Sequence, residues 1–147
     1  MIFKVMFDSD KVEDSVILAE EFLRGQLHCI LGMTNFKYTE QSPEQVFNHI
    51  SSCVNGFDTN RPLLVTKFKT KIPWSSAIGQ TTQLGYEINS RKLNALTVPA
   101  LVGNAVHEFT HNPCGYFHPY FSTKDRPLSV SYWLGSQATL WAKNHGY

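Results

Sequence analysis

The sequence predicts an α+β fold for residues 1–147, with a small twisted mixed sheet and about three helices. Three observations support this class. Short segments of alternating apolar residues, which favour strands, occur between longer segments in which apolar residues recur at helical spacing. The chain has 147 residues, of which 42% are hydrophobic, so it can form a substantial core. The sequence shows no internal repeat, and we therefore expect a single domain.

The first third of the chain is expected to form a strand, a helix and an extended segment. Residues 2–7 alternate weakly between apolar and polar side chains and favour a strand. Residues 12–23 place apolar side chains at helical spacing and are followed closely by a glycine that is expected to end the helix. Residues 27–38 are interpreted as extended, because a glycine and an asparagine interrupt any helical periodicity there.

A second helix and two strands are expected in the middle of the chain. Ser42 is predicted to be the N-cap of the helix, with Pro43 at its first position and Gln45 placed to complete a capping box. Residues 63–71 alternate and favour a strand with one solvated face. Residues 84–89 alternate in the same way and favour another strand.

Two further helices are expected in the last third of the chain. Thr97 is the predicted N-cap of the first, which has Pro99 in its first turn and is expected to end near His111. Its apolar residues are spaced to face a core. A last helix is predicted over residues 132–143, although Gly135 lowers the helix propensity of that segment.

Composition gives no reason to expect binding to nucleic acid or to an anionic membrane. Charged residues make up 17% of the chain, and the formal net charge is +1. Lys67, Lys69 and Lys71 are predicted to share one strand face, interpreted as a solvated edge that discourages strand pairing. A nucleic-acid surface is the alternative. His28 and His49 lack neighbouring ligands in the sequence and are interpreted as packing or surface residues.

The sequence carries no recognisable targeting or membrane signal. Its first residues turn acidic after a short apolar run, unlike a secretory signal. No window approaches the roughly 18 uninterrupted apolar residues of a membrane span. Cys29, Cys53 and Cys114 are odd in number and widely spaced, which argues against a disulfide framework. We therefore expect a cytoplasmic protein, or one released without a signal peptide.

The segment HEFTHNPCGYFH, residues 107–118, contains the strongest functional pattern. His107 and His111 are four residues apart, so on a helix they share one face about 6 Å apart along the axis. Both imidazoles can therefore bind one zinc ion, which in catalytic sites takes three protein ligands and leaves a fourth position to water. The carboxylate of Glu108 can take a proton from that water. The alternative is two surface histidines and a solvated glutamate on an ordinary helix.

A third ligand is expected after the helix, where the sequence contains no glutamate. Pro113 is predicted to end the helix near His111. Gly115 permits a left-handed turn that brings the chain back. His118 follows three residues later and is the favoured third ligand. The alternatives are Cys114, Asp125 and His145.

This pattern resembles that of the zincin metallopeptidases, which carry H-E-x-x-H on a helix packed under a twisted sheet. The metzincins extend it to H-E-x-x-H-x-x-G-x-x-H, from which this segment differs by one extra residue before Gly115. The resemblance implies a zincin-like fold with the motif helix central, Glu108 as general base and Zn2+ held by His107, His111 and His118. Metzincins also have a methionine turn beneath the metal, whereas all three methionines here precede the motif. Either residues 126–135, RPLSVSYWLG, form that floor, or the relationship stops at the broader zincin level.

The resemblance also implies how a peptide or protein substrate would bind. In zincins an edge strand ahead of the active-site helix pairs with the substrate backbone as an added antiparallel strand. The segment that begins at Leu84 and ends at Asn89 has that position in the sequence, and an ordinary sheet strand is the alternative. A tyrosine hydroxyl near the metal could stabilise the tetrahedral oxyanion, and Tyr132 is the favoured candidate. Tyr116 and Tyr120 are the other candidates, with aromatic packing the simpler role for each.

The sequence therefore predicts a zinc metallopeptidase that hydrolyses peptide bonds with a metal-activated water and Glu108 as the base. A non-catalytic, zinc-stabilised binding or structural module is the first alternative, because the same ligands could hold a metal without turnover. A protease directed to DNA-bound proteins is a further alternative, and it would require the predicted lysine face to bind nucleic acid.

Overall fold

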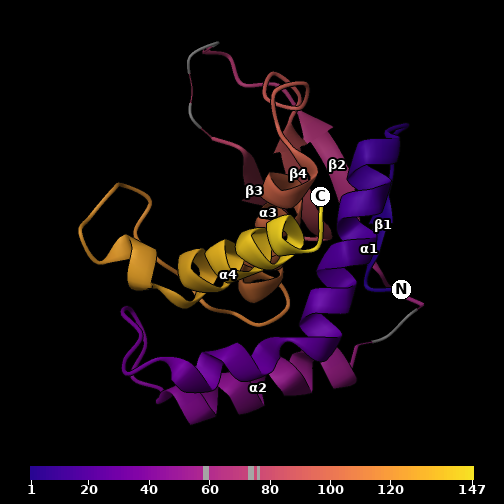
Figure 1. Cartoon of the computed structure of the whole chain (residues 1–147). Coiled ribbons are helices and arrows are strands. Elements are labelled where there is room, and N and C mark those ends of the chain that lie inside the picture. The colour runs from indigo at the N-terminus through magenta and orange to yellow at the C-terminus, as the bar shows by residue number, and fades with distance from the viewer. Residues whose placement is uncertain (58–59, 73–74, 76) are drawn as a thin grey trace.

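The computed structural model describes residues 1–57, 60–72, 75 and 77–147, and it has an α+β architecture (Figure 1). The described residues form four α-helices, two short 3-10 helices and one four-stranded sheet. In their order across the sheet, the strands are β1 (Phe3–Val5), β2 (Leu63–Phe68), β4 (Gly85–Asn89) and β3 (Gly79–Thr81). The predicted class is confirmed, with four α-helices in the described residues in place of about three.

The sheet is mixed, as predicted. Strands β1, β2 and β4 run parallel, and β3 runs antiparallel to β4. Because β4 lies between β2 and β3, both of its edges are already paired. The expectation that residues 84–89 form an edge strand open to a substrate is therefore wrong. The edge strand beside β4 is β3, whose three residues are too few to show a strand period in the sequence.

The helices begin at small polar residues that cap them. The α-helices are α1 (Asp10–Gly25), α2 (Pro43–Asn55), α3 (Val98–His111) and α4 (Val130–Asn144). Each has an N-cap side chain that accepts a backbone N–H of the first turn, and these caps are Ser9, Ser42, Thr97 and Ser129. The capping box predicted for α2 is complete, since the backbone N–H of Ser42 donates to the side chain of Gln45. Every helix in the described part of the chain is too short or too polar to cross a membrane.

The extended segment predicted for residues 27–38 is wrong in its first half. Residues Leu27–Gly32 form the 3-10 helix η1. In a 3-10 helix, side chains three residues apart lie on the same side. Leu27 and Ile30 are such a pair, and both are buried in the core. The burial of Leu27 and Ile30 favours this 3-10 helix over the extended conformation that the glycine in this segment suggested.

The predicted lysine face on residues 63–71 is also wrong. Strand β2 ends at Phe68, so Lys69 and Lys71 lie beyond it and share no strand face with Lys67. Lys67 itself lies over the aromatic ring of Phe7, 5.1 Å from its centroid. The three lysines therefore do not form the regular basic surface that the alternation suggested.

Helix α3 is central, as predicted, and contacts α1, α4, β3 and β4. Figure 1 shows α4 crossing in front of α3, with its C-terminal end beside α1. The two helices approach closely because each has a glycine at the crossing. A Cβ at Gly103 would lie 2.7 Å from the carbonyl oxygen of Gly135, and a Cβ at Gly135 would lie 3.3 Å from the Cβ of His107. Gly135, which weakened the helix prediction, is thus required by this packing.

Candidate metal centre

Three histidines converge at the C-terminal end of α3. His107 and His111 come from its last turns and His118 from the loop that follows. The Nε2 atoms of His107 and His111 are 3.1 Å apart, those of His111 and His118 are 3.1 Å apart, and those of His118 and His107 are 3.3 Å apart. Tetrahedral nitrogen ligands about 2.0–2.1 Å from a zinc ion lie about 3.3–3.4 Å from one another. The three Nε2 atoms therefore fit one small metal ion.

The second ring nitrogens of His111 and His118 are held by backbone carbonyls. Nδ1 of His111 lies 2.7 Å from the carbonyl oxygen of Tyr116, and Nδ1 of His118 lies 2.9 Å from that of Pro119. His107 forms a hydrogen bond with the backbone of Ser131. A carbonyl oxygen can only accept, so Nδ1 of His111 and of His118 carries the proton, and the Nε2 lone pair of each is free to face a metal.

The protein environment keeps these imidazoles neutral. Burial, followed by the positive charges that His111 and His118 would carry, lowers the pKa of His107 to about 3. Burial is also the main cause that lowers the pKa of His111 and the pKa of His118. A neutral imidazole is the form that binds a metal ion, so the cluster is in the binding form at neutral pH.

The turn after α3 forms as the sequence predicted. Helix α3 ends at His111, and the backbone N–H of Gly115 donates to the carbonyl oxygen of His111 at 3.0 Å. Gly115 has a φ of 81°, in the left-handed region that favours glycine. This turn brings His118 back toward α3, although the motif is one residue longer than in the metzincins.

The three alternative ligands lie outside the cluster found in the described residues. Cys114 is buried, and its carbonyl oxygen lies 2.7 Å from Nε2 of His49. Asp125 precedes the 3-10 helix η2 (Arg126–Leu128). His145 follows the last residue of α4, with Nδ1 2.8 Å from the carbonyl oxygen of Trp141. His118 is the candidate that the fold brings to His107 and His111.

Glu108 lies beside the cluster and faces the sheet. It is 4% exposed, and its Oε2 accepts a hydrogen bond of 2.7 Å from Oγ1 of Thr81 on β3. Burial raises the pKa of Glu108 to about 7, and the bond from Thr81 opposes that rise. Thr81 could not be predicted from the sequence, because the strand that carries it has three residues and is too short to be recognised.

Tyr132 packs against two of the histidines from the start of α4. Its ring centroid lies 4.6 Å from that of His107 and 4.6 Å from that of His118. The guanidinium carbon of Arg126 lies 4.7 Å from the centroid of the Tyr132 ring. Within the segment of residues 126–135, Tyr132 thus packs against the cluster and Arg126 lies over Tyr132. Arg126 was not predicted from the sequence.

The other two tyrosines do not contact the three histidines in the same way. The hydroxyl of Tyr116 donates to the side chain of Gln41, and its ring meets the edge of His49. Tyr120 is 97% exposed. Of the three tyrosine candidates, Tyr132 is therefore the one that packs against the metal cluster. His49 supports the loop through Tyr116 and the Cys114 carbonyl, as expected for a packing residue.

The outer edge of β3 is next to Glu108. The backbone N–H of Thr82 donates to Gly85, and the N–H of Asn89 donates to Ile78. Along an antiparallel strand, the backbone N–H and C=O groups of successive residues point alternately toward the partner strand and away from it. The backbone groups of Thr81 therefore face outward, and no further strand of the described residues pairs with that edge.

Comparison of the chain with protein-family models, curated proteins and solved structures finds no match. Three neutral nitrogen donors can hold a metal ion. A buried carboxylate beside them can accept a proton, and an open strand edge adjoins both.

Proposed function

We propose that the chain is a zinc-dependent peptidase of the zincin type. His107, His111 and His118 would bind the ion, and Glu108 would act as general base. The observation that carries this proposal is the convergence of three Nε2 atoms, 3.1–3.3 Å apart, beside a buried carboxylate that is not itself in the cluster. The central position of α3 and the mixed sheet with an antiparallel edge strand agree with this assignment.

Zinc is the metal that this donor set favours. Imidazole nitrogens suit zinc, and three of them in a tripod leave one position for water. Structural zinc sites instead have four protein ligands, and the described residues supply three here. When bound, the ion would act as a Lewis acid and lower the pKa of a water molecule toward about 7.

Glu108 would move the proton during hydrolysis. Its carboxylate would accept the proton as the oxygen of water attacks the carbonyl carbon of the peptide, and would return it to the leaving amine nitrogen. The hydrogen bond from Thr81 fixes one carboxylate oxygen, Oε2. That bond would hold the other oxygen, Oε1, toward the water, so Thr81 would be a positioning residue.

The substrate would bind along β3 and pass Glu108. An extended peptide that adds to the outer edge of β3 as an antiparallel strand would pair with the backbone of Thr81. The hydroxyl of Tyr132 would donate a hydrogen bond to the oxyanion of the tetrahedral intermediate, which the contacts of its ring with His107 and His118 support. This replaces residues 84–89 by β3 as the proposed substrate strand.

The test compares the zinc-loaded wild type with Glu108→Gln on a mixed peptide library. We expect about one zinc per chain in both proteins and cleavage by the wild type. In Glu108→Gln the rate should fall about 10²–10⁴-fold, which is the usual contribution of a general base. Glu21→Gln is the matched control, because Glu21 is exposed on α1 and should leave both zinc content and rate unchanged.

Two results would contradict the proposal in different ways. If wild type and Glu108→Gln bind zinc equally and neither cleaves any library peptide, the chain is a zinc-stabilised module without turnover. If the wild type cleaves peptides after zinc has been removed by a chelator, the histidine cluster is not the catalytic centre.

A further inference from the structure

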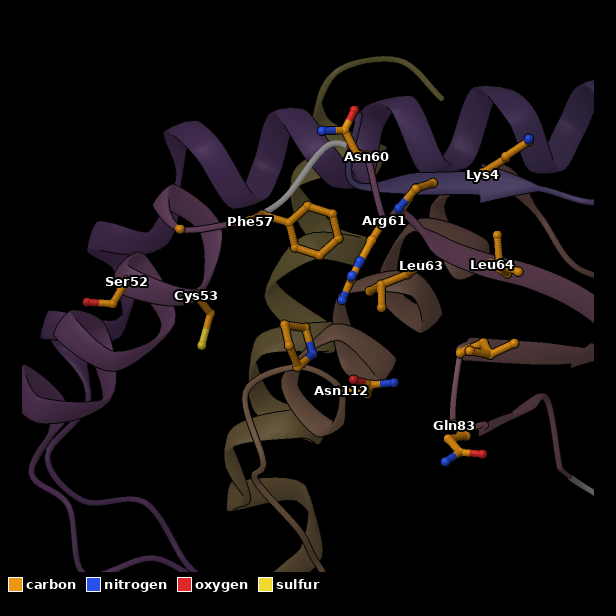
Figure 2. A pocket seen from close by; sticks show the side chains of 14 residues that line it. Lys4, Ser52, Cys53, Phe57, Asn60, Arg61, Leu63, Leu64, Gln83 and Asn112 are labelled. Atoms are coloured by element: carbon orange, nitrogen blue, oxygen red, sulfur yellow. The ribbon is translucent and has the colours of Figure 1, made fainter.

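A pocket adjoins the end of α3 and is not yet used by the proposed function. Its volume is about 770 Å³, within the range of about 300–1,000 Å³ that is usual for ligand sites. It lies between the end of α2, the start of β2 and the first residues after α3, as Figure 2 shows. Its walls are largely apolar and include Phe57, Leu63, Leu84 and Pro113.

The charged groups of this pocket are all positive among its described lining residues. Arg61 and Lys4 line it, and none of the described lining residues is acidic. Figure 2 shows the side chain of Arg61 extending between Phe57 and Leu63 toward Asn112. The ion pairs of the described residues involve neither cation. A guanidinium in a largely apolar pocket whose described lining residues include no carboxylate favours an anionic ligand.

The pocket begins where the proposed substrate strand and α3 both end. Asn112 lines it and directly follows His111, and its side-chain amide donates to the carbonyl oxygen of Thr82 at 3.1 Å. Gln83 also lines the pocket and follows Thr82 along the chain. Thr81, which precedes Thr82, donates a hydrogen bond to the carboxylate of Glu108. A substrate peptide that lies along β3 and passes Glu108 would therefore reach this pocket at the carboxyl end of β3.

The direction of the substrate decides which part of it reaches the pocket. A peptide that pairs antiparallel with β3 has its amino-terminal part beside the carboxyl end of β3. The residues before the scissile bond would therefore lie nearest Gln83 and the pocket. A free C-terminal carboxylate would lie at the opposite end, so the carboxylate that meets Arg61 would belong to a side chain.

We propose that this pocket selects substrates with an aspartate or glutamate on the amino-terminal side of the scissile bond, and that Arg61 binds its carboxylate. The inference rests on the proposed peptidase function. Two parallel N–H···O bonds from the guanidinium would match the two carboxylate oxygens, which lysine cannot do. Arg61 is thus a specificity-determining residue.

The first experiment measures kcat/KM of the zinc-loaded full chain on paired peptides. The pairs differ only by glutamate or glutamine, placed in turn at each position before the scissile bond. At one position we expect the wild type to favour glutamate about tenfold, equivalent to about 1.4 kcal/mol. The ratio should fall to about one in Arg61→Ala and to an intermediate value in Arg61→Lys. Lys143→Ala removes one exposed positive charge outside the pocket and should keep the wild-type ratio.

The inference is overturned if both peptides of every pair are cleaved at equal rates, or if the preference for glutamate persists in Arg61→Ala. Either result would leave the peptidase proposal intact. A second experiment measures binding of the same peptides to zinc-loaded Glu108→Gln, which should not turn them over. Tighter binding of the glutamate peptide that is lost with Arg61→Ala supports the pocket even if no protein cleaves a peptide, and in that case the peptidase proposal alone fails. Equal binding of the two peptides would overturn the inferred selectivity of the pocket in this experiment as well.

Discussion

The three histidines of the metal cluster come from two different regions, a helix and a loop. Helix α3 supplies His107, His111 and Glu108 from consecutive turns that are packed on several sides. The loop of residues 112–129 supplies His118 and exposes large aromatic side chains, with Phe117 and Phe121 each 70% exposed. The helix positions its ligands by periodicity and packing, whereas the loop positions its ligand by a turn and by hydrogen bonds to backbone carbonyls.

The hydrogen bonds around each region explain this difference. On α3, Oγ1 of Thr110 donates to the carbonyl oxygen of His107 at 2.7 Å and contacts the hydroxyl of Ser131 on α4. The loop instead contacts the distant N-terminal half of the chain, through His49 on α2 and through Gln41 just before it. Substitutions in the helix should therefore act on global stability, while substitutions in the loop should act mainly on metal affinity.

The largest expected effect is the loss of a ligand from either region. Zinc-binding free energies of about 10–16 kcal/mol are shared by about four ligands, so each contributes about 3 kcal/mol or more, about 10²-fold in Kd. His111→Ala and His118→Ala should each weaken zinc binding by at least that factor in competition with a chromophoric chelator. His28→Ala, on an exposed histidine outside the cluster, is the control. A normal Kd in His118→Ala would mean that the loop supplies no ligand.

A smaller effect is expected from Gly103→Ala in the helix region. An alanine gains about 1 kcal/mol of helix propensity, but its Cβ would lie 2.0 Å from Oγ1 of Thr139 and 2.7 Å from a backbone oxygen. Overpacking of up to about 3 kcal/mol outweighs that gain, so the free energy of unfolding should fall by about 2 kcal/mol in urea titrations. Gly25→Ala, where a Cβ meets nothing within 4 Å, should cause no loss. Equal stability of both variants would show that the α3–α4 crossing is looser than described.

The smallest effect on stability is expected from Gly115→Ala in the loop region. The added Cβ meets nothing within 4 Å, but the φ of 81° is unfavourable for alanine by about 1–2 kcal/mol. Part of that strain can relax by moving the exposed loop. We therefore expect a loss of less than about 1 kcal/mol in unfolding without metal, together with a clear loss of zinc affinity by titration calorimetry. Unchanged affinity would show that the turn does not position His118.

The sequence predicts those features of the structure that depend on a single residue and its own turn. The Ser42 capping box, the Thr97 cap and the end of α3 before Pro113 could all be predicted, because caps and prolines act on their own turn. The spacing of His107 and His111 is likewise a local property of a helix. Gly115 could be predicted to adopt a left-handed turn for the same reason.

The parts that could not be predicted depend on contacts between distant segments. Thr81 reaches Glu108 from a three-residue strand, and Arg126 reaches Tyr132 from a 3-10 helix of three residues, both too short to leave a periodic pattern. The edge of the sheet depends on strand order, which a single segment does not encode. For this reason the sequence wrongly predicts an edge strand at residues 84–89, where β3 lies outside β4.

A crystal structure of the zinc-loaded chain, with anomalous diffraction recorded on both sides of the zinc edge, tests the central claim most directly. The account predicts one zinc peak per chain, about 2.0–2.1 Å from Nε2 of His107, His111 and His118, with a non-protein oxygen as the fourth ligand. A peak coordinated instead by Cys114, Asp125 or His145, or no peak among the three imidazoles, would contradict it.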